Sequence, residues 1–157
     1  IMAYDPFVSA ERMAELGVEK ATLDEVLAAS NAISLHLPAT PETVGMVSKD
    51  FIAKMKDGAY LVNTARGGLV NEQDLYDALK NGKLAGAGLD VFSSEQISFS
   101  PLFTLENVAL TPHTSARATA CWRHMVACSL ENILQFHRGE NVRFLLNPEY
   151  REHAKEI

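Results

Sequence analysis

The stretch AYLVNTARGGLVNEQDL, residues 59 to 75, joins an apolar run to an arginine and two glycines. Residues 60–62 predict a buried strand, and residues 72–79 predict a helix. Arg66 therefore follows the carboxyl end of a strand, which is the edge where open α/β sheets bind their ligands. The glycine pair at 67–68 lets the chain turn sharply after the arginine. This stretch predicts an α/β fold with a guanidinium on its ligand-binding edge.

Composition narrows the class of protein. The 157 residues are 47% hydrophobic, enough for one compact domain with a sizeable core. The formal net charge of −6 and the lack of a Lys/Arg cluster argue against nucleic acid and anionic membrane as partners. No apolar run approaches the roughly 20 residues of a membrane-spanning helix, and the first residues do not read as a signal peptide. We expect a cytoplasmic protein.

Strand and helix patterns alternate along the chain. The β-type runs are nearly all apolar, as expected of parallel strands covered on both faces; they lie at 1–5, 33–37, 59–64, 85–91 and 107–112. Helical patterns lie between them at 10–16, 23–29, 49–55 and 72–80. Such alternation predicts a doubly wound parallel sheet of the Rossmann type. From Ala116 onward, one apolar face predicts a single long helix closed by Gly139.

Asp5 ends the first apolar run. At the end of the second strand of a dinucleotide-binding fold, an acidic residue binds the adenosine ribose hydroxyls; the alternative is a turn or cap aspartate. That fold also requires a GxGxxG loop about 20 residues earlier, and residues 1–4 leave no room for it. The glycines of GKLAGAGLD (82–90) lead into a strand and cannot serve as this loop. We therefore expect a Rossmann-like sheet that lacks its first strand and glycine loop.

The other predicted strand ends are also polar or rich in proline. LHLPATPET (35–43) forms an extended loop suited to lie beside a flat ligand. LDVFSSEQ (89–96) contains Asp90 and Glu95, and TPH (111–113) ends in His113, a candidate general acid/base. Taken singly, Arg66 could be a solvated surface residue and His113 a structural one. Parallel topology, however, brings Arg66, Glu95 and His113 to one edge of the sheet.

Several motifs in order resemble the D-isomer-specific 2-hydroxyacid dehydrogenases. The resemblance runs from about Ala3 to Tyr150. It is carried by LHLPATPETVGMV (35–47), LVNTARGGLVNEQDL (61–75), NGKLAGAGLDVFSSE (81–95), NVALTPHTSA (107–116) and LLNPE (145–149). It implies an oxidoreductase that moves a hydride between NAD(H) and a small D-2-hydroxy acid or 2-keto acid. Which acid cannot be read from these motifs.

The resemblance also assigns roles residue by residue. It implies that Arg66 binds the substrate carboxylate, that His113 is the acid/base, and that Glu95 orients His113. It implies NAD as the cofactor, lined by Asp5, Leu37, Pro38, Thr43, Thr64, Ala65, Asp90 and Ser115. No histidine spacing fits a metal site, so we predict none.

The same resemblance divides the chain into three parts. Residues 1–116 would be a partial dinucleotide-binding domain, 117–140 a helix bridging towards a substrate lobe, and 141–157 a segment of that lobe. We expect a fragment that is inactive alone, from a protein that forms a homodimer. One alternative is a non-catalytic NAD(H)-sensing or scaffold module like the corepressor relatives of this family. Another, a flavodoxin-like regulator, fits the size but leaves the ordered motifs unexplained.

Overall fold

A computed structural model describes residues 1–94, 99–114, 117–143, 145–147 and 149. The chain divides into two compact units, Ile1–Thr114 and Ser115–Ile157. The first unit contains the β-sheets, and the second contains the long helix. The finer division at residues 116 and 140 stays a prediction.

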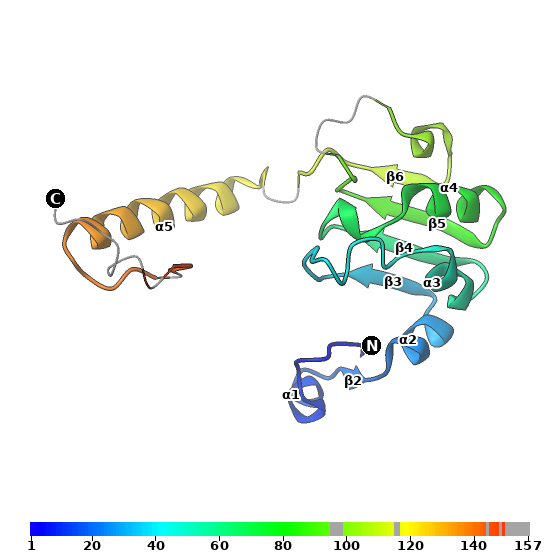
Figure 1. The fold of residues 1–157 in the computed structure, drawn as a ribbon, viewed down its shortest axis with the longest axis horizontal. Helices are drawn as coiled ribbons and strands as arrows, with labels where there is room; N and C mark the ends of the chain where they lie inside the picture. The colour runs from blue at the N-terminus through cyan, green and yellow to red at the C-terminus, as the bar shows by residue number, and fades with distance from the viewer. Residues whose placement is uncertain (95–98, 115–116, 144, 148, 150–157) are drawn as a thin grey trace. The chain divides into compact units, whose positions relative to one another are not determined.

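The larger sheet has four parallel strands (Figure 1). Their order is β3-β4-β5-β6, with bounds Ala32–Leu35, Ala59–Asn63, Leu84–Leu89 and Val108–Leu110. Helix α3 (Lys49–Lys54) connects β3 to β4, and α4 (Glu72–Lys80) connects β4 to β5. A short 3₁₀ helix, η2 (Pro101–Thr104), precedes β6. Parallel strands joined through helices confirm the Rossmann-like fold predicted from the sequence.

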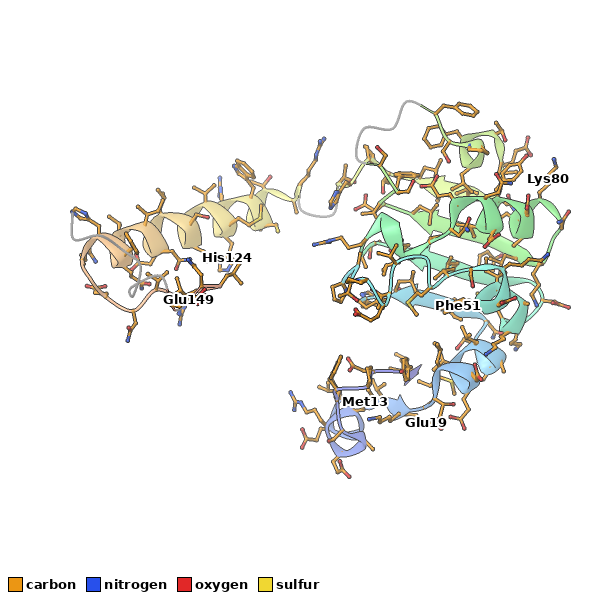
Figure 2. The ribbon with its side chains drawn as sticks, in the orientation of Figure 1. Met13, Glu19, Phe51, Lys80, His124 and Glu149 are labelled. Atoms are coloured by element: carbon orange, nitrogen blue, oxygen red, sulfur yellow. The ribbon has the colours of Figure 1, made fainter. Side chains whose placement is uncertain are left out.

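One face of this sheet forms the core. Leu61, which is fully buried, points into a cluster with residues of α3, α4 and α2 (Leu23–Ala29). Figure 2 shows these side chains, with Phe51 of α3 labelled. The members contributed by the helices are Leu27, Phe51, Ile52, Leu75, Ala78 and Leu79. This cluster holds the strands in register and so fixes where they end.

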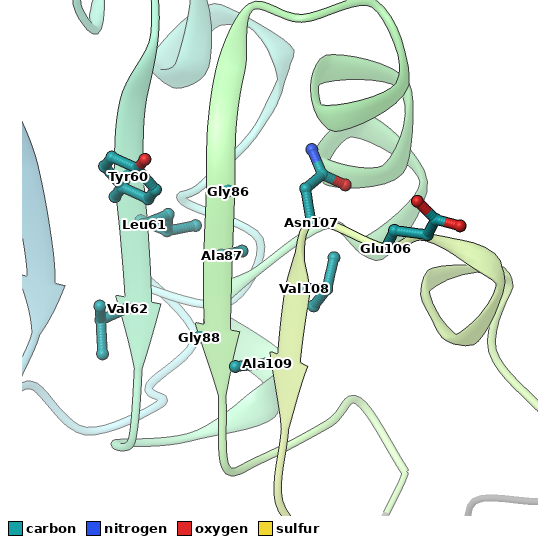
Figure 3. A pocket seen from close by; sticks show the side chains of 10 residues that line it. All are labelled: Tyr60, Leu61, Val62, Gly86, Ala87, Gly88, Glu106, Asn107, Val108 and Ala109. Carbon is teal, nitrogen blue, oxygen red and sulfur yellow. The ribbon is translucent and has the colours of Figure 1, made fainter.

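The opposite face of the larger sheet is exposed in the part of the first unit that the structure describes. Burial alternates along β3 and β4, and Tyr60 is 53% exposed. A shallow pocket on this face is lined by residues that include Tyr60, Val62, Gly86, Gly88 and Ala109 (Figure 3). The continuous apolar runs had predicted burial on both faces. In the part of the first unit that the structure describes, the buried residues of α2, α3 and α4 all belong to one core cluster.

The first apolar run pairs outside the larger sheet. Strand β1 (Met2–Ala3) forms a separate two-stranded parallel sheet with β2 (Glu19–Lys20), after helix α1 (Ala10–Glu15). Main-chain bonds flank this pairing, one from the Glu19 N–H to the Ile1 carbonyl at 3.0 Å. The sequence did not predict β2 because the strand is only two residues long and both are charged and exposed.

In the second unit, helix α5 spans Thr119–His137. Gly139 follows it with φ of 69°, and its N–H donates to the Phe136 carbonyl at 3.1 Å. This is the left-handed helix end that glycine favours, and it confirms the predicted long helix and its stop. None of the helices described here is long and apolar enough to cross a membrane.

Candidate functional site

The carboxyl ends of β4 and β5 lie side by side because the two strands are adjacent and parallel. Main-chain bonding continues past both strands: the Asp90 N–H donates to the Asn63 carbonyl at 3.0 Å. The His113 N–H, after β6, donates to the Asp90 carbonyl at 2.8 Å. The turns that carry Arg66 and His113 therefore start from one hydrogen-bonded edge, as parallel topology predicted.

Asn63 shapes the turn that carries Arg66. Its side chain is buried, with Nδ2 donating to the Arg66 carbonyl at 2.9 Å and Oδ1 accepting from the Ala65 N–H at 3.1 Å. Arg66 itself is exposed, and its Nη1 donates to the Ala65 carbonyl at 2.6 Å. A guanidinium has five N–H donors, so this contact leaves others to bind a carboxylate.

Gly67 and Gly68 act differently from the sequence expectation. Neither has a positive φ, so the turn does not depend on left-handed backbone at this pair. Glycine is required at position 67 because the backbone of Phe92 lies against it: a Cβ there would lie 1.7 Å from the Phe92 carbonyl oxygen. At Gly68 a Cβ would meet only ordinary contacts, at 3.9 Å from the Ala39 Cβ. Gly67 thus packs the Arg66 turn against the chain that leaves β5.

The loop after β3 lies against the segment that follows Arg66. The Gly45 N–H donates to the Gly68 carbonyl at 2.8 Å, and the Val47 N–H donates to the Leu69 carbonyl at 2.9 Å. Within this loop, Thr43 donates from Oγ1 to the Pro38 carbonyl at 2.8 Å. The structure therefore brings the LHLPATPETVGMV motif (35–47) against the ARGGLV segment (65–70), through bonded residues more than twenty positions apart.

Two other predicted cofactor residues of this region differ in exposure. Leu37, half-buried, packs against the core, whereas Thr64 is exposed at the end of β4. In the same loop after β3, hydrogen bonds from the Thr40 side chain and then from the backbone at Glu42 hold the pKa of Glu42 below its ordinary value.

Asp90 holds the turn that carries His113. Its Oδ1 accepts hydrogen bonds from the Thr111 hydroxyl and from the Thr114 N–H, the latter at 2.9 Å. These two threonines flank Pro112-His113, and His113 adopts a φ of 52°, a conformation that non-glycine residues rarely adopt. Asp90, buried at 5% exposure, thus ties both sides of a strained turn. The sequence predicted Asp90 as a cofactor residue, and this structural role was missed.

Glu95 and Ser115 lie outside the described residues. The chain on either side of 95–98 is anchored, because the Glu72 carboxylate accepts from the Ser93 N–H at 2.8 Å and from the Ser100 hydroxyl at 3.1 Å. Glu72 is the first residue of α4, so one side chain joins that helix to both flanks of this segment. Sequence reasoning did not single out Glu72 in this role.

Asp5 lies just past β1 and is half-buried. Its Oδ1 accepts from the Phe7 N–H at 2.8 Å, which closes a turn through Pro6. This is the turn role that the sequence had left open as an alternative. The ribose-binding role stays a prediction. Among the residues that the structure describes, no three His, Cys, Asp or Glu side chains could hold a metal ion together.

Comparison with known proteins identifies the class. Residues 1–115 match the family model of the D-isomer specific 2-hydroxyacid dehydrogenase, NAD binding domain. A D-3-phosphoglycerate dehydrogenase of Mycobacterium bovis is 52% identical over 116 residues, which are 74% of this chain and 22% of that protein. A glyoxylate reductase of Korarchaeum cryptofilum is 43% identical over 150 residues, 95% of this chain and 45% of that protein.

Among solved structures, D-lactate dehydrogenase with NAD+ from Lactobacillus jensenii superposes with a TM-score of 0.84 at 32% identity. That match covers 92% of this chain and 47% of the other. The chain belongs to the D-isomer specific 2-hydroxyacid dehydrogenases, a family of NAD-dependent oxidoreductases, and residues 1–115 match its NAD-binding domain. It spans less than half the length of each of these relatives.

The residues present fit NAD in part. Small or polar side chains stand at the strand ends, with Thr64 exposed and Ala65 half-buried beside the Arg66 turn. Asp5 stands at the end of β1, where a carboxylate can accept hydrogen bonds from ribose hydroxyls. Residues 1–157 contain no GxGxxG loop between a strand and a helix for the pyrophosphate. The NAD cofactor predicted from the sequence is confirmed at the level of the family.

Proposed function

We propose that this chain is the cofactor-binding part of an NAD-dependent dehydrogenase that interconverts a small D-2-hydroxy acid and its 2-keto acid. The observation that carries the proposal is the hydrogen-bonded edge from which the Arg66 and His113 turns both start. One turn presents a guanidinium suited to a carboxylate, and the other presents an imidazole suited to proton transfer.

In this proposal Arg66 binds the substrate carboxylate with two N–H groups and orients the adjacent carbonyl. His113, with Glu95 as its partner, donates a proton to the keto oxygen in reduction and accepts the hydroxyl proton in oxidation. NAD supplies the hydride chemistry when bound. Asp5, Leu37, Pro38, Thr43, Thr64, Ala65, Asp90 and Ser115 are proposed to line the cofactor.

The identity of the acid is left to the assay. Relatives include a D-3-phosphoglycerate dehydrogenase and a glyoxylate reductase, so glyoxylate, pyruvate, hydroxypyruvate and phosphohydroxypyruvate form the panel. By analogy with the family, we also propose that the protein forms a homodimer and that it is cytoplasmic. We further propose that the 157-residue chain is part of a longer protein and is inactive alone.

The test uses the full-length protein that carries this sequence. NADH oxidation is followed with each keto acid, and His113→Ala is compared with His137→Ala, an exposed histidine of α5. We expect His113→Ala to lower kcat by about 10²- to 10⁴-fold, the usual share of general acid–base catalysis, with the Kd for NADH nearly unchanged. His137→Ala should behave as wild type.

Two results would contradict the proposal. An unchanged kcat in His113→Ala would remove that imidazole from proton transfer. Wild-type protein that binds NADH and reduces no keto acid of the panel would favour the sensing or scaffold alternative.

A further inference from the structure

Asn63 is a buried polar side chain that the proposed mechanism does not use. It is the last residue of β4, and only 1% of its surface is exposed. A buried amide without hydrogen bonds is costly, so the partners of Asn63 show which conformation it stabilises. Both of its side-chain hydrogen bonds are made to residues within three positions of it in sequence. Nδ2 donates to the Arg66 carbonyl, and Oδ1 accepts from the Ala65 N–H.

The main chain of Arg66 is therefore held from both sides. The Asn63 amide closes the turn before it, and the backbone of Gly67 packs on that of Phe92 immediately after it. The Arg66 carbonyl also accepts the Leu69 N–H at 3.3 Å. Ala65 links the two side chains, because its N–H bonds to Asn63 and its carbonyl bonds to the guanidinium.

We propose that Asn63 is a positioning residue for substrate binding, which acts by fixing the turn from which the Arg66 guanidinium reaches the substrate carboxylate. The proposal rests on the proposed function of Arg66. A two-point contact between a guanidinium and a carboxylate tolerates little displacement of the arginine main chain. The bond from Nδ2 to the Arg66 carbonyl therefore acts on keto-acid binding and on catalysis. The bond that Oδ1 accepts from the Ala65 N–H holds a proposed cofactor residue, so the test must keep that bond in place.

The test is Asn63→Asp in the full-length protein. The two side chains have the same shape, and the new carboxylate can still accept the Ala65 N–H. It cannot donate to the Arg66 carbonyl, and it repels that oxygen. We expect kcat/KM for the keto acid to fall about 10- to 100-fold, mostly through a higher KM, because displacement by about 1 Å has effects of this size. The Kd for NADH should stay within about twofold.

A double-mutant cycle separates positioning from general damage. Arg66→Lys removes the two-point contact, so Asn63→Asp should add little loss of kcat/KM in that background. Asn31→Asp is the matched control, because Asn31 is exposed and its Oδ1 accepts from Lys56 outside the site. Asn63→Ser replaces Asn63→Asp in the cycle if the carboxylate variant does not fold, as judged by thermal unfolding.

The outcomes are distinct. The positioning role is supported if Asn63→Asp lowers kcat/KM for the keto acid in the wild-type background and has almost no further effect on it in the Arg66→Lys background. Unchanged KM and kcat in a folded Asn63 variant, or losses that multiply independently of Arg66, would overturn it and leave the proposed function standing. Absence of keto-acid reduction by the wild-type protein would overturn the proposed function and this inference together.

Discussion

At the scale of single residues, buried polar side chains shape the candidate site. Asn63, Asp90 and Ser100 are each at most 5% exposed. Asn63 and Asp90 bond to the chain beyond strand ends, whereas Ser100 caps the 3₁₀ helix η2 and donates to Glu72 of α4. A buried polar group stabilises the one backbone conformation that satisfies it, because any other leaves it unpaired. The exposed groups proposed for catalysis thus depend on buried neighbours for their placement.

The two glycines after Arg66 offer a test of close packing. Gly67→Ala places a methyl group where the Phe92 carbonyl now lies, so the backbone must move. We expect the free energy of unfolding to fall by about 1–3 kcal/mol or more, as for overpacked cores, and keto-acid reduction to fall with it. Urea unfolding and steady-state kinetics measure the two effects.

Gly68→Ala is the matched control, since a methyl group there makes only ordinary contacts. Its free energy of unfolding should stay within about 0.5 kcal/mol of wild type. Equal effects of the two substitutions would show that the Gly67–Phe92 contact does not constrain the turn.

At the scale of elements, helices α1 to α4 begin at capping side chains near them in sequence. Ser9, Thr22, Ser48 and Asn71 each accept a backbone N–H from the first turn of the helix that follows. In α2 the cap is reciprocal, because the Glu25 carboxylate accepts from the Thr22 N–H at 2.8 Å. Such local bonds make helix starts predictable from sequence.

This capping box predicts a pH-dependent contribution to stability. Hydrogen bonds from the Thr22 side chain, and then from its backbone N–H, lower the pKa of Glu25. A lowered pKa means that the stabilisation is present at neutral pH and is lost as the pH falls through the folded-state pKa. The difference in urea midpoint between wild type and Glu25→Gln should therefore shrink from pH 7 to about pH 3.

Thr22→Ala should lower the free energy of unfolding by about 1 kcal/mol, as loss of a helix cap usually does. For the pH prediction at Glu25, the matched control is Glu19→Gln, because Glu19 lies on the two-residue strand β2 and caps no helix.

The pH prediction would be contradicted if the difference in urea midpoint between wild type and Glu25→Gln grew as the pH fell.

At the scale of the whole molecule, the chain carries the carboxyl edge of a parallel sheet and no glycine loop. Dinucleotide folds hold the pyrophosphate on such a loop at a helix N-terminus, while strand-end residues bind the ribose and the base. The 157 residues therefore supply part of the expected contacts to NADH.

Because the 157 residues lack the loop that binds the pyrophosphate, we expect this chain to bind NADH at least about tenfold more weakly than the longer protein of which it is proposed to be a part. A tenfold change in Kd corresponds to about 1.4 kcal/mol. Titration followed by NADH fluorescence measures both affinities, with Asp5→Ala in each protein testing the proposed ribose contact. Equal affinities would show that the strand-end residues are sufficient for binding.

Much of this architecture was predictable because its determinants are local. The helices at 23–29 and 72–80 have the expected bounds, and four of the five predicted runs became β3 to β6 within a few residues. Apolar periodicity, caps and glycine stops lie within a few positions of the elements that they specify. Strand β2 was missed because two exposed charged residues carry no such pattern.

The sequence by itself determined the order of strands and helices, the family, and the candidate side chains at the strand ends, since these follow from short-range pattern and motif. Only the tertiary structure decided that Asn63 closes the Arg66 turn, that Asp90 holds both sides of His113, and that Gly67 packs on Phe92. The Asp90 and Gly67 contacts join residues more than twenty positions apart. Even the local Asn63 bonds matter because its side chain is buried. Long-range packing has no signature in a local pattern, and so it was visible only in the fold.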